Sequence, residues 1–473
     1  MAEVLQTDLC IIGAGSGGLS LAAGAAQMGA RVVLIEGAEM GGDCLNHGCV
    51  PSKALIAAAH AAHAMGAGAA FGVAPAEPRV DYAAAMEHVA RTIAAIAPHD
   101  SQERFEGLGV RVIRDWAAFT GPDEVAAGDI RVCARRFVVA TGSSPAIPPI
   151  PGLDAVPYLT NETLFTRRER PAHLVVIGGG PIGLEMAQAH RRLGSAVTVV
   201  EAAQALARED PDLAAVVLAR LRAEGVEIVE GTGVSEVAGE PGAVTVTLAD
   251  GRAIAGSHLL VATGRRPNLD RLNLDGAGIR HAAAGIRVDA GLRTTNRRVY
   301  AIGDAAGQGQ FTHLAGHHAG VVIRSILFGL PARARRDHIP RATYTDPELA
   351  QVGLTEAEAR KAHGPAVSVI SLPFTANDRA QATNRTEGLL KLVVHRGRPV
   401  GAGIAGAQAG ELIAPWALAI SARLKLSAVA GTVLPYPTLA EIDKRAAGAY
   451  FSPKLFDNAM VRRVVAAVQR VLP

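Results

Sequence analysis

The chain has 473 residues, of which 49% are hydrophobic and 19% are charged, a globular composition that excludes a disordered or collagen-like protein. Its 47 basic and 44 acidic residues give a net charge of +3, so no strong field for nucleic acid or anionic lipid is expected. Aromatic residues make up 4%, too few for the stacking platforms of single-stranded nucleic-acid binders. The length corresponds to roughly three domains of about 150 residues.

The first residues, MAEVLQTD, lack the basic-then-apolar pattern of a secretory signal, so we expect a cytoplasmic protein. Two long stretches without Asp, Glu, Lys or Arg, Leu9–Ala30 and Ala54–Ala76, are rich in alanine and glycine and lack the large apolar side chains of a spanning helix. We therefore expect no membrane insertion. In a reducing compartment, a close pair among the four cysteines is expected to be catalytic or metal-binding.

The first predicted elements are a short strand, Leu9–Ile12, a glycine-rich turn and an alanine-rich helix. The turn carries the pattern G-x-G-x-x-G at Gly13, Gly15 and Gly18. A second strand then ends on Glu36, 23 positions after the first glycine (36 minus 13). In such a unit the glycines let the backbone approach a pyrophosphate at the helix N-terminus, and the acid accepts a hydrogen bond from a ribose hydroxyl.

The same order of elements recurs later in the chain. The strand Leu174–Ile177 leads into Gly178, Gly180 and Gly183, then a helix, then a strand that ends on Glu201. The acid again lies 23 positions after the first glycine (201 minus 178). Because two incidental glycine turns would not share this context and offset, we expect two dinucleotide-binding domains.

Each unit is followed by Ala-Thr-Gly at the end of an apolar strand, at Thr141–Gly142 and at Thr263–Gly264. The basic segment 332–336 is interpreted as a solvated linker. From Arg341 onward, short strands and mixed helices predict a third domain of the α+β type. The predicted fold class is therefore α/β, with two Rossmann-like dinucleotide-binding domains and a C-terminal α+β domain.

Two cysteines stand directly after the first unit, at Cys44 and Cys49. On a regular helix their Cα atoms would be about 8.7 Å apart, whereas a disulfide requires roughly 4.4–6.8 Å. The segment must therefore be irregular if the pair is to bridge, and Gly48 permits this. A helix is predicted from Ser52, which places Cys49 at its N-terminus and Lys53 within its first turn. Both features lower the pKa of a thiol.

Metal binding is the alternative interpretation of these residue types. A zinc site would need two further ligands, but Cys10 and Cys133 lie inside apolar strands and are predicted to be inert core residues. His313, His317 and His318 have the spacing of helical metal ligands, yet no carboxylate or cysteine lies nearby in the sequence. We interpret them as structural, so no metal site is predicted.

Taken together, these motifs and the Tyr300–Asp304 sequence YAIGD resemble the class I pyridine nucleotide–disulfide oxidoreductases over nearly the whole chain. The resemblance implies an FAD-binding domain formed by residues 1–145 and 265–335. It also implies an NAD(P)H-binding domain at 146–264 and a C-terminal dimerisation domain at 336–473. The expected assembly is a homodimer.

The resemblance also implies roles for individual residues. Cys44 would exchange with the substrate and Cys49 would face the flavin. Lys53 would pair with Glu185 beside the flavin, and Asp304 would bind the ribityl chain. The residues expected to bind FAD are Gly13, Gly15, Gly18, Glu36, Gly42, Lys53, Thr141, Gly142, Asp304 and His313. The residues expected to bind NAD are Gly178, Gly180, Gly183, Glu201 and Gly264.

One segment departs from the family pattern. The family's disulfide reductases carry a His-Pro-Thr motif whose histidine, contributed by the partner subunit, is the thiol acid–base group. Here Tyr436 takes the place of that histidine, while Glu441 keeps the place of the following glutamate. A phenol is a poor proton carrier at neutral pH, and loss of an acid–base group lowers rates by about 10²–10⁴-fold. Mercuric reductases resemble this chain in the tyrosine but add a C-terminal cysteine pair, and no cysteine follows Cys133.

The sequence therefore predicts a flavin-dependent enzyme that passes electrons from NADH through FAD and a Cys44–Cys49 disulfide to a small-molecule or protein-bound disulfide, as dihydrolipoamide dehydrogenases do. One alternative is the reduction of Hg(II)–thiol complexes, and another is a slow-turnover redox-sensing flavoprotein. We expect NADH rather than NADPH because Glu201 would repel a 2′-phosphate. The amphipathic run Val461–Leu472 is a predicted contact of the homodimer, and neither nucleic acid nor membrane is an expected partner.

Overall fold

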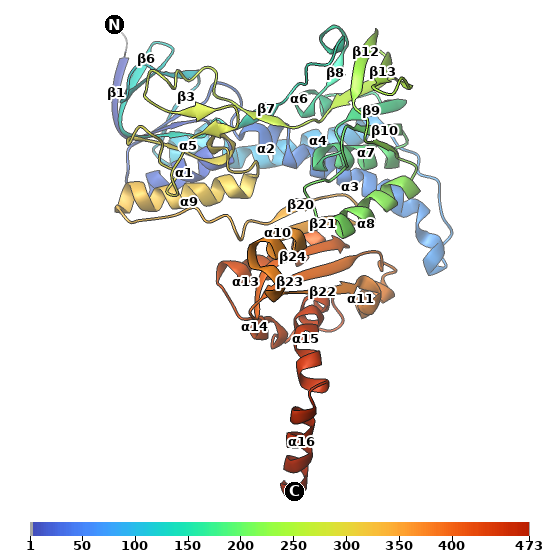
Figure 1. Ribbon diagram of the computed structural model, residues 1–473. Coiled ribbons are helices and arrows are strands. Elements are labelled where there is room, and N and C mark those ends of the chain that lie inside the picture. The colour runs from blue at the N-terminus through green and yellow to red at the C-terminus, as the bar shows by residue number, and fades with distance from the viewer. Residues whose placement is uncertain (1–2, 473) are drawn as a thin grey trace. The chain divides into compact units, whose positions relative to one another are not determined.

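The computed structural model describes residues 3–472, and Figure 1 shows its elements in chain order. The chain divides into two compact units. The larger contains residues up to 202, apart from 69–73, together with 228–335; the smaller contains 69–73, 203–227 and 336 onward. The larger unit holds most of both predicted dinucleotide-binding domains, and their exact boundaries stay a prediction. No helix within residues 3–472 is long and apolar enough to cross a membrane.

The first sheet of the larger unit contains the first predicted strand–turn–helix–strand unit. Its central strand β1 begins at Glu3 rather than at Leu9, because it pairs with β6 from Glu3 onward. The apolar half of β1 lies between two parallel neighbours, which is why it forms a continuous hydrophobic run. In sheet order the strands are β3 (Arg111–Ile113), β2 (Val32–Ile35), β1 (Glu3–Ile12), β6 (Ile130–Val139), β5 (Glu124–Ala127) and β4 (Ala117–Phe119), with β19 (Val299–Ala301) paired to β6.

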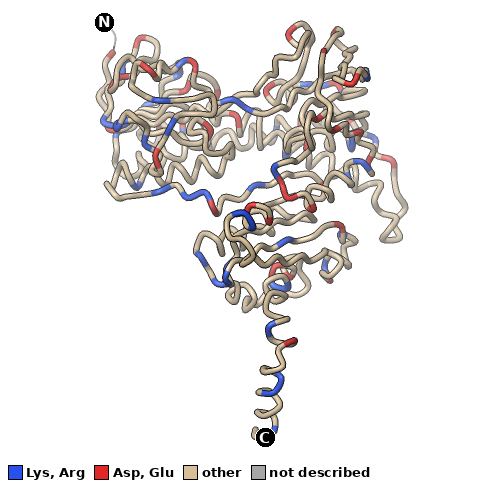
Figure 2. Tube along the Cα trace, in the orientation of Figure 1, with Lys and Arg blue, Asp and Glu red and all other residues tan. Residues whose placement is uncertain are grey.

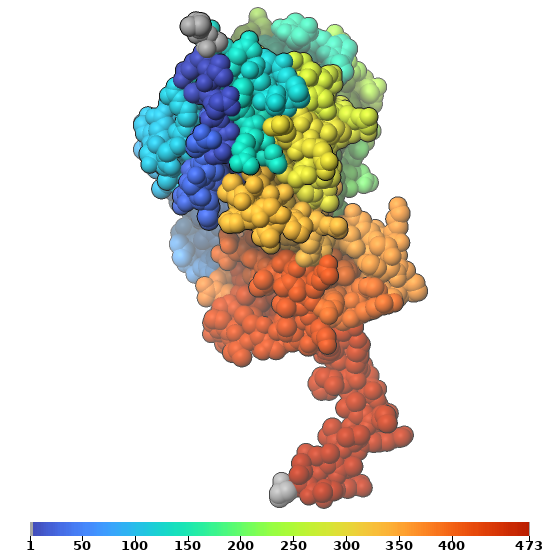
Figure 3. All heavy atoms as spheres, turned by 90° about the vertical axis from the view of Figure 1, so that its left-hand side faces the viewer, coloured from blue at the N-terminus to red at the C-terminus, as the bar shows by residue number. Residues whose placement is uncertain are grey.

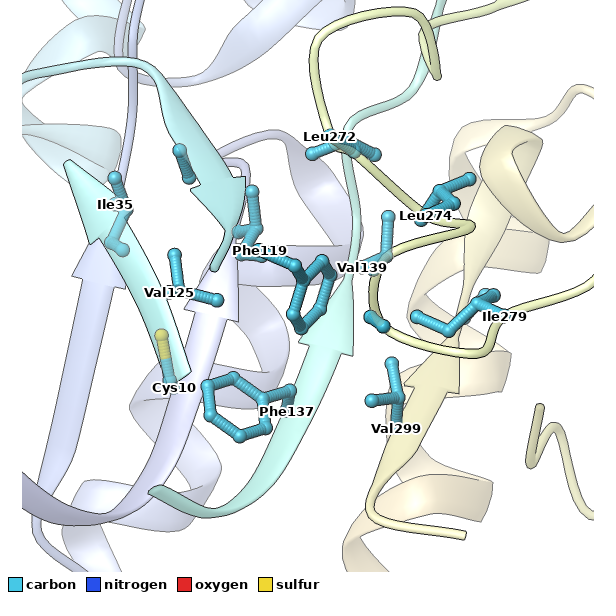
Figure 4. Close-up of a cluster of buried hydrophobic side chains, with 14 of the residues drawn as sticks. Cys10, Ile35, Phe119, Val125, Phe137, Val139, Leu272, Leu274, Ile279 and Val299 are labelled. Carbon is cyan, nitrogen blue, oxygen red and sulfur yellow. The ribbon is translucent and has the colours of Figure 1, made fainter. Parts of the chain in front are cut away.

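A cluster of apolar side chains covers one face of this sheet (Figure 4). Phe119 and Phe137 meet edge to face within it, with ring centroids 5.6 Å apart. Cys10 is fully buried there, as predicted, and burial raises the pKa of its thiol. The prediction that Cys133 is a core residue is wrong. Its side chain is half-buried because it lies on the opposite face of β6 from the buried neighbours, and its thiol donates to Glu124 at 3.7 Å.

The second sheet of the larger unit repeats the arrangement around β9 and β10, which pair in parallel. Its strands follow the order β11 (Glu227–Glu230), β10 (Ala196–Glu201), β9 (His173–Ile177), β15 (His258–Val261) and β8 (Tyr158–Leu159). A separate antiparallel sheet lies between β11 and β15 in the sequence, formed by β12 (Val234–Glu240), β13 (Ala243–Leu248) and β14 (Ala253–Gly256).

Two short strands carry the chain between the two sheets of the larger unit. β7 (Ser143–Pro145) and β16 (Arg265–Pro267) pair in antiparallel fashion. The chain leaves the first sheet through β7 and returns toward it through β16, so the two crossings run side by side. The small strands β17 (His281–Ala282) and β18 (Gly285–Ile286) follow.

Helices pack around these sheets, and glycines allow one especially close approach. A Cβ at Gly24 of α1 would lie 2.6 Å from Ile323 Cδ1 of α9, so a larger residue there would require the Ile323 side chain to move. The helices of the larger unit are α1 (Ser16–Gln27), α2 (Gly42–Asn46), α3 (Cys49–Gly66), α4 (Tyr82–Ile96), α5 (Gln102–Gly107), α6 (Asn161–Leu164), α7 (Pro181–Arg192) and α9 (Thr312–Phe328).

The smaller unit has the α+β organisation that the sequence predicts. An antiparallel sheet is covered by helices around a core that includes the buried Trp416. The strand order is β20 (Arg341–Thr343), β21 (Glu348–Gly353), β24 (Arg398–Gly406), β23 (Leu389–His395) and β22 (Val367–Pro373). Its later helices are α10 (Glu356–His363), α11 (Asp378–Ala382), α12 (Ala409–Leu412), α13 (Ala414–Ser421), α14 (Leu426–Ala430), α15 (Glu441–Phe456) and α16 (Ala459–Val471).

One helix of the smaller unit comes from the middle of the chain. α8 (Pro211–Ala223) follows the second glycine unit in sequence but belongs to the smaller compact unit. Its buried Leu213 lies so close to β24 that a Cβ at Gly403 would be 2.3 Å from it. At its N-terminus, Lys391 Nζ lies 3.0 Å from Asp210 and 2.7 Å from Asp212. Packing and ion pairs therefore both hold α8 on this sheet.

The C-terminal helix α16 projects from the rest of the smaller unit, as the space-filling view shows (Figure 3). None of its residues is buried. Basic residues are visible along it (Figure 2), and Arg462 and Arg463 lie on the face opposite Val464 and Val468. The amphipathic pattern predicted for this run is therefore present on a helix, and its role in a homodimer stays a prediction.

Candidate active site

The segment between the two cysteines is irregular, as their spacing requires. α2 ends at Asn46, the chain leaves helical geometry at His47 and Gly48, and α3 begins at Cys49. Cys44 and Cys49 therefore lie on different helices. The helix predicted from Ser52 begins three residues earlier, at the second cysteine itself.

The two thiols share a hydrogen bond that separates their pKa values. This hydrogen bond is the largest cause that lowers the pKa of Cys49 to about 6, and the Thr312 hydroxyl and the Lys53 ammonium add to it. The same hydrogen bond, together with burial, raises the pKa of Cys44. Thr312 Oγ1 lies 3.5 Å from Cys49 Sγ. When both thiols are reduced, the negative charge is therefore held on Cys49.

Lys53 and Glu185 meet, as the resemblance implies. Lys53 Nζ lies 2.9 Å from Glu185 Oε2. The Glu185 side chain is only 6% exposed, whereas Lys53 is 36% exposed. Lys53 lies in the first turn of α3 and Glu185 on α7, so the pair joins the cysteine helix to the helix of the second glycine unit.

The first glycine turn leaves open space in front of the N-terminus of α1. A Cβ at Gly13 would lie 2.4 Å from Ala140 O, and one at Gly18 would lie 1.9 Å from Gly13 O, so both glycines are required by packing. A Cβ at Gly15 would meet nothing within 4 Å, and no side chain caps the helix there. Gly42 closes the turn from the other side, with its Cβ position 2.8 Å from Gly15 Cα. This cradle of helix amides fits a pyrophosphate.

The second glycine turn has the same construction. A Cβ at Gly178 would lie 2.4 Å from Ala262 O, and one at Gly183 would lie 2.0 Å from Gly178 O. The space around Gly180 is open, and no side chain caps α7. Both turns therefore fit the pyrophosphate of a dinucleotide at an uncapped helix N-terminus.

The acid at the end of each second strand reaches back to its own glycine turn. Glu36 accepts hydrogen bonds from the amides of Ala14 at 2.6 Å and Ala38 at 2.7 Å. Glu201 accepts from the amide of Gly179 at 2.8 Å. Each carboxylate is thereby held beside its glycine turn, and contact with a ribose stays a prediction for both.

The two Ala-Thr-Gly segments turn through left-handed glycines. Gly142 has φ of +66° and Gly264 has φ of +132°, conformations that favour glycine. A Cβ at either position would meet nothing within 4 Å. The Thr141 hydroxyl donates to Asn268 O at 2.8 Å. Roles in cofactor binding remain predictions for Thr141, Gly142 and Gly264.

Asp304 and His313 lie on either side of the loop that enters α9. Asp304 Oδ2 accepts a hydrogen bond from the Ser143 hydroxyl at 2.5 Å, and burial raises the pKa of its carboxyl. His313 is exposed and stacks on Phe311, with ring centroids 5.3 Å apart. The flavin contacts of both residues stay predictions.

Tyr436 and Glu441 lie in the smaller unit and do not bond to each other. The Tyr436 hydroxyl donates to Asp378 Oδ2 at 3.0 Å, and this hydrogen bond raises the pKa of the phenol. The Asn377 side-chain amide holds the turn between them by donating to the carbonyls of Thr438 and Leu439. Glu441 Oε2 is buried and lacks a hydrogen-bond partner among the described residues.

Several residues of this site were not singled out from the sequence. Arg265 forms an ion pair with Asp43, the residue before Cys44, at 3.0 Å. Asn161 donates to the same carboxylate at 2.9 Å. Thr312 contacts Cys49. Only Thr312 had a local signal, since it directly precedes His313, which the resemblance assigns to FAD binding.

No group of three or more His, Cys, Asp or Glu side chains that could hold a metal ion occurs within residues 3–472. Of the three histidines with helical spacing, His318 is fully buried and accepts a hydrogen bond from the amide of Gly303 at 3.2 Å. That contact fixes α9 against the turn that carries Asp304, which is a structural role.

Two family models match the chain: the pyridine nucleotide-disulphide oxidoreductase model over residues 7–319, and the dimerisation-domain model of the same family over residues 339–447. The mercuric reductase of Streptomyces lividans is 36% identical over 457 residues, covering 94% of this chain and 96% of its own. The dihydrolipoyl dehydrogenase of Geobacillus stearothermophilus is 35% identical over 455 residues, with the same coverage.

Two solved structures are also similar to this chain over nearly its whole length. The Cu(II) complex of the HOCl-induced flavoprotein disulfide reductase RclA from Escherichia coli has a TM-score of 0.83 at 30% identity, covering 93% of this chain and 99% of its own. LpdA from Mycobacterium tuberculosis has a TM-score of 0.86 at 28% identity, covering 94% and 99%.

Proposed function

Because the chain belongs to the class I pyridine nucleotide–disulfide oxidoreductases, a family of FAD-dependent enzymes that use NAD(P)H, we propose that it passes electrons from NADH to a small disulfide through Cys44 and Cys49. The observation that carries this proposal is the placement of the two thiols. Cys44 and Cys49 lie on successive helices across an irregular turn, and Thr312 Oγ1 lies 3.5 Å from Cys49 Sγ. In keeping with this placement, the pKa of Cys49 is lowered and that of Cys44 is raised. We expect the enzyme to be a homodimer, in keeping with its dimerisation domain.

The two cradles are assigned to the two dinucleotides. FAD would occupy the turn at Gly13, Gly15 and Gly18, with Glu36 on its ribose. NADH would occupy the second turn, with Glu201 as the ribose acceptor. When bound, FAD supplies two-electron transfer between NADH and the disulfide. The remaining FAD contacts are those expected for Gly42, Lys53, Thr141, Gly142, Asp304 and His313, and the remaining NADH contacts are those expected for Gly178, Gly180, Gly183 and Gly264.

The side chains of this chain carry out the thiol chemistry. Two electrons break the Cys44–Cys49 bond, and the Thr312 hydroxyl and Lys53 ammonium stabilise the resulting Cys49 thiolate. Cys44 then loses its proton and attacks the acceptor disulfide, which forms a mixed disulfide and releases one thiol. Cys49 attacks Cys44 and releases the second thiol. The balance is NADH, one proton and one disulfide converted to NAD⁺ and two thiols.

A second acceptor class is favoured by one observation. Tyr436 donates a hydrogen bond to Asp378, and its raised pKa makes it a still weaker proton carrier at neutral pH than a free phenol. A Hg(II)–thiol complex brings its own thiolates and needs less proton transfer than a disulfide. Reduction of thiol-bound soft metal ions is therefore the second candidate function, in line with the mercuric reductases among the relatives.

The experiment that ranks these functions is anaerobic reduction with NADH, followed by rapid mixing with disulfides, quinones and Hg(II)–thiol complexes. The flavin absorbance reports reoxidation. Fast reoxidation by a disulfide that is lost in Cys44→Ala supports the leading proposal. Preference for Hg(II)–thiol complexes supports the second. Reoxidation no faster with any acceptor than in buffer would overturn both and favour a redox-sensing role.

A further inference from the structure

The residue before Cys44 has an unusually well-defined environment. Asp43 Oδ1 lies 3.0 Å from Arg265 Nη2 and accepts a hydrogen bond from Asn161 Nδ2 at 2.9 Å. The same Asn161 amide donates to His47 O, in the irregular segment between the cysteines, at 3.1 Å. The other carboxylate oxygen of Asp43, Oδ2, lies over Gly48. A Cβ added at Gly48 would be 2.8 Å from this oxygen. Asp43 and Asn161 together therefore hold this segment: Asp43 directly precedes Cys44, and Asn161 binds both Asp43 and the His47 carbonyl.

Arg265 connects this carboxylate to both crossing strands. It lies on β16, and its Nε and Nη2 donate to the hydroxyl and the carbonyl of Ser143 on β7 at 2.8 Å and 2.6 Å. Its Nη1 donates to Asn161 Oδ1 at 3.3 Å. The Arg265 side chain is 12% exposed, and four acceptors surround its planar fork. Ser143 in turn donates to Asp304.

The charges around the cysteines come from several elements. Lys53 on α3 lowers the pKa of Cys49, whereas Asp43 on α2 raises the pKa of both cysteines. Thr312 on α9 contributes a hydroxyl. His47 Nε2 lies 3.3 Å from Glu39 Oε2. Asp43 is thus the negative group that opposes a thiolate here, and Arg265 is its ion-pair partner.

We propose that Asp43 and Arg265 are a positioning pair for the redox-active segment, in which Arg265 ties Cys44 to the two crossing strands and neutralises the carboxylate that would otherwise oppose the cysteine thiolate. The inference rests on the proposed use of Cys44 and Cys49 as the reactive pair. It adds two residues, outside the assigned machinery, that control when these thiols carry charge.

A purely structural ion pair and a charge-tuning pair differ in one measurable way. If the pair only holds the backbone, removing either partner loosens the same segment and changes thiol reactivity in the same direction. If its charges also act on the thiolate, removing the negative partner and removing the positive partner have opposite effects.

The experiment uses the flavin-containing enzyme reduced with dithiothreitol and then freed of reductant. Alkylation of Cys44 and Cys49 by iodoacetamide is followed by mass spectrometry from about pH 5 to about pH 9, where only thiolate reacts. For each cysteine, the midpoint is the pH at which alkylation reaches half its maximal rate. We expect Asp43→Asn to shift this midpoint downward and Arg265→Gln to shift it upward, each by about half a pH unit. The double variant should return close to the parent midpoint.

Two further variants separate charge from geometry. Arg265→Lys keeps the charge but not the fork, so the midpoint should stay near that of the parent while disulfide exchange slows. Arg266→Gln is the matched control, because Arg266 is the next residue on β16 and forms an exposed ion pair with Asp270 at 2.9 Å. It should leave the midpoint unchanged.

Shifts of opposite sign in the two single variants support the inference, and shifts of equal sign or no shift overturn it. The proposed function is judged separately, by whether NADH alone produces two new alkylatable thiols in the parent enzyme. Failure of that reaction would remove the redox role of the pair but leave the titration of the dithiothreitol-reduced thiols as a test of the charge effect.

Discussion

The two glycine units have nearly the same backbone and differ in the helix that follows. Both turns have two glycines that packing requires and one that faces open space, and both return a carboxylate to the turn. α1 carries no ionisable side chain and packs on α9 through glycines. α7, in contrast, carries Glu185 and His190, and both are buried.

This difference shows how the second copy of a repeated unit makes contacts that the first copy lacks. Glu185 extends from the second unit to Lys53 beside the cysteines. His190 donates through Nδ1 to Met186 O at 2.8 Å and so accepts from the Tyr82 hydroxyl through Nε2 at 3.1 Å. The turn is therefore the constant part of the unit, whereas the buried polar residues of the helix connect the second unit to the rest of the site.

The largest effect should come from filling the two cradles. Gly15→Ala and Gly180→Ala are matched, because at both positions the added methyl meets open space and φ is negative. Both variants should fold, but Gly15→Ala should lose most of its flavin, whereas Gly180→Ala should retain it and resist reduction by NADH. Flavin content and anaerobic NADH titration measure this. Equal flavin loss in both would contradict the assignment of the cradles.

The next largest effect concerns the ion pair between Lys53 and Glu185, which α7 of the second glycine unit makes and α1 of the first does not. Replacing Lys53 with Met should slow flavin reduction by NADH by about 10²-fold, since the charge-assisted hydrogen bond to Glu185, close to the cysteines, is lost. Glu185→Gln should have a smaller effect in the same direction. Stopped-flow absorbance gives the rate, and Lys361→Met on α10 serves as the exposed control. An unchanged rate in Lys53→Met means that the pair is structural only.

A pH effect should distinguish the second unit from the first. Burial lowers the pKa of His190 to about 4 from its ordinary value of 6.5, so the folded state resists protonation. Above pH 6.5 the shifted pKa of His190 does not reduce the free energy of unfolding. As the pH falls from 6.5 toward 4, the free energy of unfolding decreases by about 1.4 kcal/mol per pH unit, because the unfolded state binds the proton more readily. At about pH 5 the loss should be about 2 kcal/mol.

The measurement is the melting temperature of the flavin-containing protein at about pH 7 and about pH 5. His190→Gln, whose amide can replace the imidazole hydrogen bonds, should reduce the drop between the two values. His88→Gln, at an exposed position on α4, should not change it. If His190→Gln and the parent lose stability in parallel, the acid sensitivity comes from elsewhere.

The smallest effect concerns Glu36 and Glu201, the carboxylates that bind back to the two glycine turns. Glu201→Ala should narrow the preference for NADH over NADPH by about tenfold, because a repulsive charge near the 2′-position is removed. Glu36→Ala should leave that ratio unchanged and weaken flavin retention instead. Ratios of kcat/KM for the two nucleotides decide the matter, and a parent enzyme that prefers NADPH would contradict the role of Glu201.

The sequence predicted what depends on local pattern. Spacing was enough for the two glycine units and for the break between Cys44 and Cys49, and family resemblance was enough for the Lys53–Glu185 pair. The contacts that escaped prediction join residues far apart in the chain, such as Asp43 with Arg265 and Tyr82 with His190. No periodicity or motif encodes them, because they depend on how separate strands and helices pack.

Cys133 is a second case in which the local sequence pattern was not enough to predict the environment of a side chain. Its neighbours are apolar, so the sequence suggested a core position, but the two faces of β6 differ in burial. Cys133 lies on the less buried face, where its register partner on the neighbouring strand β5 is Glu124. A strand pattern predicts alternation; it does not say what covers each side.

The placement of α8 has a consequence for anyone who recombines this protein with a relative. An exchange at the predicted boundaries, 146 and 264, would remove Asp210 and Asp212 from their contacts with Lys391 while leaving the buried ammonium behind with Glu356, 3.0 Å away. It would also withdraw Leu213 from the surface of β24. The module predicted to bind NAD(P)H should therefore be exchanged without residues 203–227, which should be inherited with the C-terminal unit, so that a chimera takes every member of this ion-pair cluster from one parent.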